Sequence, residues 1–163
     1  MDRTYLLVAL KDRQEHDTAD LLMPTKPQKG IPSVEKAAEV YNGGLPDLQS
    51  ETTKAPYIVN KILNSTFRQL PGQQPESLVT VRSVLCVYNE KHDEGAMMLL
   101  NLMERIRISF QKNPILDKRY ELDMEIGIQD LCYPDDTAPP FYLGEMITVW
   151  KLPPVKREVR QWL

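Results

Sequence analysis

Histidine and cysteine are scarce in this chain of 163 residues, which contains two of each. His16 and His92 stand far apart, and neither lies beside a plausible nucleophile or a second metal-type ligand. Cys86 and Cys132 have no cysteine neighbour in the sequence. Because zinc sites and redox pairs need several such residues at fixed spacing, we expect two reduced thiols and neither a metal nor a cofactor.

Long apolar runs and a strong charge excess are also missing. The sequence has no apolar run of about eighteen residues, and residues 1–10 include Asp2, so we expect neither a membrane span nor a signal peptide. The formal charge is -3 and the pI is near 5.5, without the basic excess that favours binding to a phosphate backbone. These properties predict a cytoplasmic protein that does not recognise nucleic-acid sequences.

Sequence motifs for nucleotide binding and for hydrolysis are missing too. The chain contains no G-x-x-x-x-G-K-[ST] or G-x-G-x-x-G loop, and no serine lies in a G-x-S-x-G setting. Enzymes of these classes therefore have little support in the sequence.

The pattern along the chain predicts one domain, whose 42% hydrophobic residues are enough for a single core. Residues 1–54 are expected to hold an N-terminal helix over 3–22, a loop rich in proline and lysine over 23–33 and a short strand at 37–41. Residues 55–154 are the expected core, and residues 155–163 form a charged tail that contains Trp162.

The expected core combines strands with one long helix. Alternating β-branched residues predict strands at 55–63 and 78–88, and residues 93–113 predict an amphipathic helix. The apolar positions of this helix recur at short steps: Ala96, Leu99, Leu100, Met103, Ile106 and Phe110. We therefore predict an α+β fold, with a mixed or antiparallel sheet of about four to five strands packed against one long helix plus the N-terminal helix.

Acidic and apolar residues alternate over 119–128, which predicts a strand with Glu121, Asp123 and Glu125 pointing outwards. A solvated face is favoured over catalysis, because an acid-base pair needs one carboxylate desolvated and the other not. If the face lined a channel for DNA, its negative charge would keep the phosphates from binding. The three residues are thus our candidate assembly or lumen face.

The last expected strand, residues 142–152, carries few charges. An edge strand without proline or strong charge tends to pair with another chain unless it is covered. Tyr142, Glu145, Thr148 and Trp150 are therefore candidate interface residues, and burial beneath the N-terminal helix is the alternative.

Local motifs across residues 37–157 carry a resemblance to a known family. They are Ala-Pro-Tyr-Ile-Val at 55–59, Val-Leu-Cys-Val-Tyr at 84–88 followed by Asp-Glu-Gly at 93–95, and the segments 99–107 and 144–153. In this order of elements the chain resembles tail terminator or tail completion proteins of long-tailed phages and prophages.

The resemblance implies a subunit that assembles with itself into a ring, expected to be a hexamer. The ring would end the tail tube and join it to the head connector, so the implied partners are the tail-tube protein and the head-neck connector. It implies no enzymatic activity, metal or cofactor, and a location in the host cytoplasm during assembly and then in the virion neck.

Three alternatives stay open. Another neck or head-tail connector protein would share the same architecture. A small cytoplasmic enzyme would use Glu121, Asp123, His92 or Asp135. A regulatory module would bind a peptide on the face of the sheet.

Overall fold

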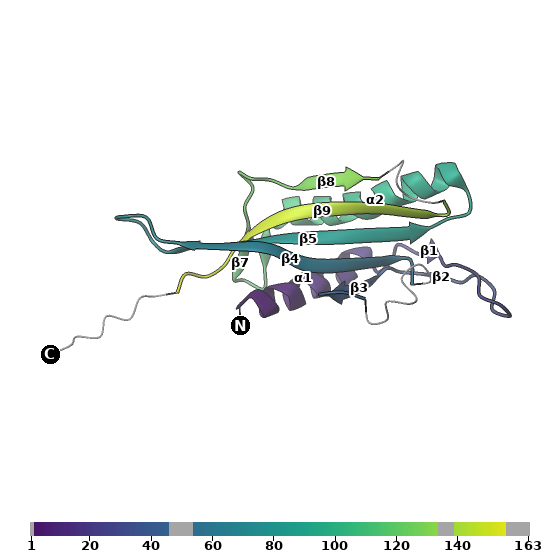
Figure 1. The fold of residues 1–163 in the computed structure, drawn as a ribbon, viewed down its shortest axis with the longest axis horizontal. Coiled ribbons are helices and arrows are strands. Elements are labelled where there is room, and N and C mark those ends of the chain that lie inside the picture. The colour runs from purple at the N-terminus through teal and green to yellow at the C-terminus, as the bar shows by residue number, and fades with distance from the viewer. Residues whose placement is uncertain (1, 46–53, 134–138, 156–163) are drawn as a thin grey trace.

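The computed structural model describes residues 2–45, 54–133 and 139–155 (Figure 1). In chain order the elements are α1 (Asp2–Thr18), β1 (Met23–Pro24), β2 (Glu35–Lys36), β3 (Glu39–Asn42), β4 (Tyr57–Arg68), β5 (Glu76–Tyr88), α2 (His92–Lys112), β6 (Ile115–Leu116), β7 (Tyr120–Leu122), β8 (Gln129–Cys132) and β9 (Phe141–Lys151). The predicted α+β class is confirmed. Both helices lie roughly where they were predicted, although α1 ends at Thr18 and does not continue to residue 22.

The main sheet has seven strands in the order β3-β4-β5-β9-β7-β6, with β8 also paired to β9. β3 runs parallel to β4, and the other pairs are antiparallel, so the sheet is mixed. The expected sheet of four to five strands is only roughly matched, because β6 and β8, of two and four residues, are too short for the sequence pattern to predict them. β1 and β2 form a separate two-stranded ladder, with β1 at the start of the predicted loop over 23–33 and β2 just after its end.

Both helices lie on the same face of the sheet, behind β4, β5 and β9 in Figure 1. The main core fills the space between them and the sheet. Leu6 and Leu10 of α1, and Ile106 and Phe110 of α2, are buried in it. The Trp150 ring is fully buried and meets the Phe110 ring edge-on, with 5.3 Å between centroids. Trp150 is therefore the largest side chain that joins α2 to β9.

A close approach fixes the first turn of α2 against β9. A Cβ atom on Gly95 would lie only 2.1 Å from the ring of Tyr142, so glycine lets the helix and the strand come together here. Further along α2, the predicted buried stripe is wrong at two positions. Ala96 and Leu100 are exposed, whereas Leu99, Met103, Ile106 and Phe110 are buried as expected.

A polar cluster is buried between α1 and the sheet. Asn60 of β4 donates from Nδ2 to Oε1 of Gln14 at 2.6 Å, and Ser83 of β5 donates from Oγ to Oδ1 of Asn60 at 2.6 Å. Gln14 and Asn60 are fully buried. Because buried polar groups must be paired to avoid a desolvation cost, this network favours a single position of α1 on the sheet.

The predicted strand over 119–128 ends early, which is a correction. β7 stops at Leu122, and Oδ1 of the buried Asp123 accepts hydrogen bonds from the backbone N–H of Glu125 and of Ile126, at 3.0 and 3.1 Å. These bonds turn the chain, and Gly127 continues the turn at a φ of +82°. Ile126 is consequently exposed and does not point inwards.

The β4–β5 pair extends beyond its neighbours. β9 pairs with β5 only as far as Leu78, and β3 pairs with β4 only between Tyr57 and Asn60. Residues 67–76, which we name the projecting hairpin, therefore leave the body of the molecule as a two-stranded ribbon (Figure 1). Phe67 and Leu70 on this hairpin are exposed.

Candidate functional site

The three acidic residues predicted to form a lumen face do not share one strand face. Glu121 lies on β7 opposite Lys151 and is exposed, and Glu125 is exposed in the following turn. Asp123 is buried between them and bonded to the backbone. The predicted geometry of the acidic row is therefore wrong, because the turn at Asp123 breaks the alternation of the strand.

The predicted interface strand is not at an edge. β9 pairs with β5 on one side and with β7 and β8 on the other. Tyr142, Thr148 and Trp150 are buried, and Trp150 packs against Phe110 of α2. Glu145 has the opposite parity on the strand, facing away from the helices. The alternative of burial is correct, although α2 and not the N-terminal helix meets Trp150.

The face of β4, β5 and β9 opposite the helices, which we name the outer face, is the more open side of the sheet. At one end a small second cluster buries Tyr57, Val59, Cys86 and Tyr88. Towards the middle, Arg82 and Glu145 form an ion pair. Neither helix covers this face in Figure 1, and the side chains of Thr80, Arg82 and Ile147 on it are half-buried.

Hydrogen bonds shift the pKa values of Arg82 and Glu145, the ion pair on the outer face. The bond from Arg82 to Glu145 raises the pKa of the arginine. Burial alone would raise the pKa of Glu145, but hydrogen bonds from Tyr133 and Arg82 outweigh it and hold that pKa below the ordinary value of 4.5. Glu145 thus stays ionised at neutral pH in a largely buried position.

The ion pair predicts a pH-dependent loss of stability for Glu145→Gln. At pH 7 we expect the free energy of unfolding to fall by about 1.5–3 kcal/mol, the range for hydrogen bonds to charged groups. The folded-state pKa is lowered, so the carboxylate stabilises the fold above its unfolded-state pKa and loses this effect as the pH falls through the folded-state pKa. Urea unfolding at pH 7 and at pH 3 measures both.

Glu125→Gln is the control, because this exposed carboxylate lies outside the pair. It should change stability little at either pH. A loss for Glu145→Gln that is equally large at both values of pH would contradict the electrostatic explanation.

An unpaired edge lies beside the outer face. Beyond Asn60, no strand within the described residues pairs with the free side of β4 over residues 61–68. Leu63 and Phe67 on this stretch are 52% and 59% exposed. An exposed edge with apolar side chains is a ready template for pairing with another chain. We regard this edge, the projecting hairpin and the outer face together as the candidate assembly surface.

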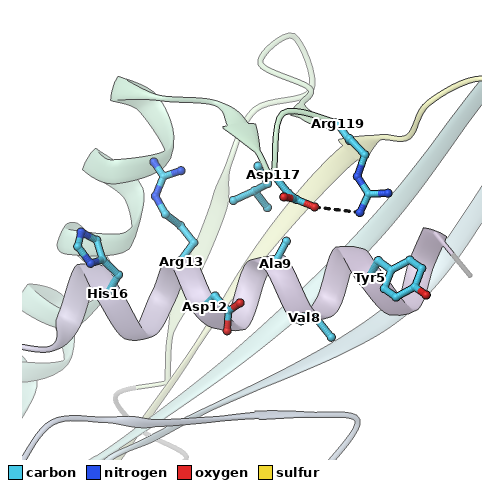
Figure 2. Close-up of a pocket in the computed structure, with 9 residues that line it drawn as sticks. Tyr5, Val8, Ala9, Asp12, Arg13, His16, Asp117 and Arg119 are labelled. Atoms are coloured by element: carbon cyan, nitrogen blue, oxygen red, sulfur yellow. Dashed lines mark hydrogen bonds and ion pairs between the residues drawn. The ribbon is translucent and has the colours of Figure 1, made fainter.

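A cavity of about 410 Å³ lies between α1 and the turn that joins β6 to β7 (Figure 2). Its arginines already have partners: Arg13 joins α1 to α2, and Arg119 pairs within the turn. Arg13 donates to the backbone oxygens of Ser109 and Asn113, at 2.9 and 3.1 Å, and so caps the end of α2. Arg119 donates to Asp117 at 2.9 Å. These contacts indicate a structural role for the cavity.

The residues named for a possible enzyme are not gathered in one cleft. His92 lies 2.8 Å from the hydroxyl of Tyr142, near the start of β9, whereas the backbone N–H of Asp123 bonds to Val149 near its end. Seven residues of strand separate these contacts by about 23 Å. Asp135 lies outside the described residues. Within those described, no group of three or more His, Cys, Asp or Glu is placed to hold a metal ion.

Sequence analysis missed Arg82 and the length of β4. In the alternating pattern of residues 78–88, Arg82 points to the opposite side of the strand from Val81. This position could have indicated a charge that faces outwards. In the second half of β4, after Ile62, apolar and polar residues do not alternate, so the sequence pattern does not predict a strand there.

The comparisons with known proteins give no family. Among the described residues, neither helix is long and apolar enough to cross a membrane. A scan of the chain against protein-family models finds no match, and a search of curated proteins finds no relative.

Proposed function

We propose that this chain is a structural protein that assembles with itself into a ring. The single observation that carries the proposal is the unpaired edge of β4 over residues 61–68, with Leu63 and Phe67 exposed. Pairing of backbone groups with a second copy would satisfy this edge and cover both side chains. If the edge contacts a different surface of the neighbouring copy, the contacts are heterologous and close into a ring when the rotation permits.

The projecting hairpin supports the same proposal. A two-stranded ribbon is only marginally stable by itself in water, and residues 67–76 extend past the strands that flank them. Such a ribbon gains apolar contacts when it lies against another subunit. Phe67 and Leu70 are the exposed side chains that a neighbour would bury.

We further propose that the ring acts as a tail terminator or tail completion protein of a long-tailed phage or prophage. The support is the resemblance across residues 37–157, together with an α+β subunit that leaves one face and one edge of its sheet uncovered. The ring, expected to be a hexamer, would end the tail tube and meet the head connector. Its role would be structural, without catalysis.

Mass measurement of the full chain tests the assembly. We expect light scattering and native mass spectrometry to give multiples of the 18.8 kDa chain, with six copies as the main closed species. Negative-stain images should then show rings. A strict monomer at high concentration, also in the presence of a tail-tube protein, would contradict the proposal.

A variant of the hairpin localises the contact. Phe67→Glu should reduce assembly, because it places a carboxylate in the interface and leaves the core unchanged. Ile31→Glu is the matched control, since Ile31 is similarly exposed but lies between β1 and β2, outside β4 and the projecting hairpin. Equal effects of the two variants would argue against the β4 surface.

A further inference from the structure

An apolar groove lies on the surface of α2, near the start of the helix and away from the candidate assembly surface. It has a volume of about 410 Å³ and is lined by Leu21, Asp93, Glu94, Met97, Met98 and Asn101. Met97 is 59% exposed. Methionine side chains are flexible and polarizable, and they are common at surfaces that bind a partner segment.

The charges around this groove are mainly negative. Asp93 and Glu94 form its rim. Through Glu94 and Met98 it continues into a second hollow, which adds Glu35 and Glu90 and the cation of Lys91. Lys91 is paired with Glu94 at 3.3 Å. The groove therefore suits a partner segment that combines apolar and basic side chains.

Residues 155–163 have this composition. Residues 155–163 read Val-Lys-Arg-Glu-Val-Arg-Gln-Trp-Leu. Val155, Val159, Trp162 and Leu163 recur at the spacing of one helical face, and Lys156, Arg157 and Arg160 fall outside it. We propose that this segment of one copy docks into the groove on α2 of a second copy, with Trp162 between the methionines and the basic residues on the acidic rim.

The length of this segment indicates that the occupant of the groove comes from another copy of the chain. Lys151 is level with Leu78 at one end of β5, whereas the groove lies beyond Tyr88 at the other end, where α2 begins (Figure 1). Ten residues of strand from Leu78 to Tyr88 span about 33 Å. A chain of seven residues from Val155 to Trp162 reaches at most about 25 Å, and it starts beyond Leu78. The segment is too short for the groove of its own chain.

The contact is heterologous, because the tail at one end of each copy meets the groove at the opposite end of the next. This inference rests on the proposed function, since it names a contact between copies of the ring. It adds a second joint that uses neither β4 nor the projecting hairpin.

A disulfide between copies tests the contact in the full chain. Met97→Cys and Trp162→Cys are combined with Cys132→Ser, which removes the exposed native thiol and leaves the buried Cys86. We expect mild oxidation to give a ladder of linked multimers on a non-reducing gel. Unlinked chains in a sample that light scattering shows to be oligomeric would overturn this inference and leave the proposed function standing. A bond within one chain would also overturn it, and a strict monomer would overturn both.

Charge reversal supplies the second readout. Glu94→Lys and Arg160→Glu should each raise the dissociation constant of self-association about tenfold, and the double variant should recover most of the affinity. Trp162→Ala should raise it about thirtyfold, as expected of a buried aromatic anchor. Glu104→Lys is the control, because Glu104 is an exposed acid on the same helix outside the groove. Unchanged affinity for Trp162→Ala, or no recovery in the double variant, would overturn the docking.

Discussion

Trp150→Ala is expected to lower the free energy of unfolding by about 3–5 kcal/mol. The indole is fully buried, meets the ring of Phe110 edge-on and donates from Nε1 to Oγ1 of Thr148 at 2.9 Å. The truncation removes this contact between α2 and β9, leaves a cavity and deprives Thr148 of a donor. Since a domain is stable by only about 5–15 kcal/mol, much of the fold's stability is at stake. Urea unfolding followed by circular dichroism measures the loss.

Val34→Ala is a suitable control for this change, because Val34 is exposed and lies outside the core. It should alter stability by less than about 0.5 kcal/mol. A loss of less than about 1 kcal/mol for Trp150→Ala would mean that Trp150 is not the joint between helix and sheet.

Asn60→Leu is expected to cost about 2–4 kcal/mol, because it leaves two buried groups without their partners. Oε1 of Gln14 loses the donor at 2.6 Å, and the hydroxyl of Ser83 loses its acceptor. The leucine is apolar and of similar size, so the cost comes chiefly from the unpaired groups. The same unfolding measurement quantifies it.

A combined variant separates this explanation from simple misfit. When Gln14→Leu and Ser83→Ala are added to Asn60→Leu, no polar side chain of the network stays unpaired, and much of the lost stability should return. If the three changes add up to a still larger loss, packing and not hydrogen bonding controls this site.

The elements with a strong pattern were predictable from the sequence. β5 carries apolar residues at nearly every second position from Val79 to Val87, and α2 repeats apolar residues at helical spacing. The side on which each helix is buried was less certain. Leu100 matched the spacing of the stripe yet is exposed, because a spacing of three or four residues allows more than one choice at the border of a helical face.

The segment after Tyr120 shows why alternation can mislead. Acidic and apolar residues alternate as far as Ile128, but Asp123 bonds to the backbone N–H groups that follow it. Such side-chain bonds compete with the hydrogen bonds of the sheet. Whether the chain turns or continues as a strand depends on whether a neighbouring strand is present. Along this side of β9 the pairing passes from β7, at Trp150 and Lys151, to β8, at residues 144–147, and the turn after Asp123 lies between the two strands.

The candidate assembly surface needed the topology of the sheet. The low charge of residues 142–152 fits both an edge strand and a buried central strand, and only the order β5-β9-β7 decides for the second. Arg82 and Glu145 are far apart in the sequence and lie diagonally across the β5–β9 ladder, where Val84 is opposite Glu145. A register of this kind cannot be derived from the spacing of one strand.

The projecting hairpin contributes to the surface of the molecule but not to its hydrophobic core. Its residues 67–76 lie outside both hydrophobic clusters, so substitutions at its tip leave the packing of the core intact. Substitutions there cost the fold little stability, but each of them changes the surface that a neighbouring molecule would meet. Under the proposed assembly, the hairpin is thus the part of this molecule in which the choice of partner can evolve independently of stability.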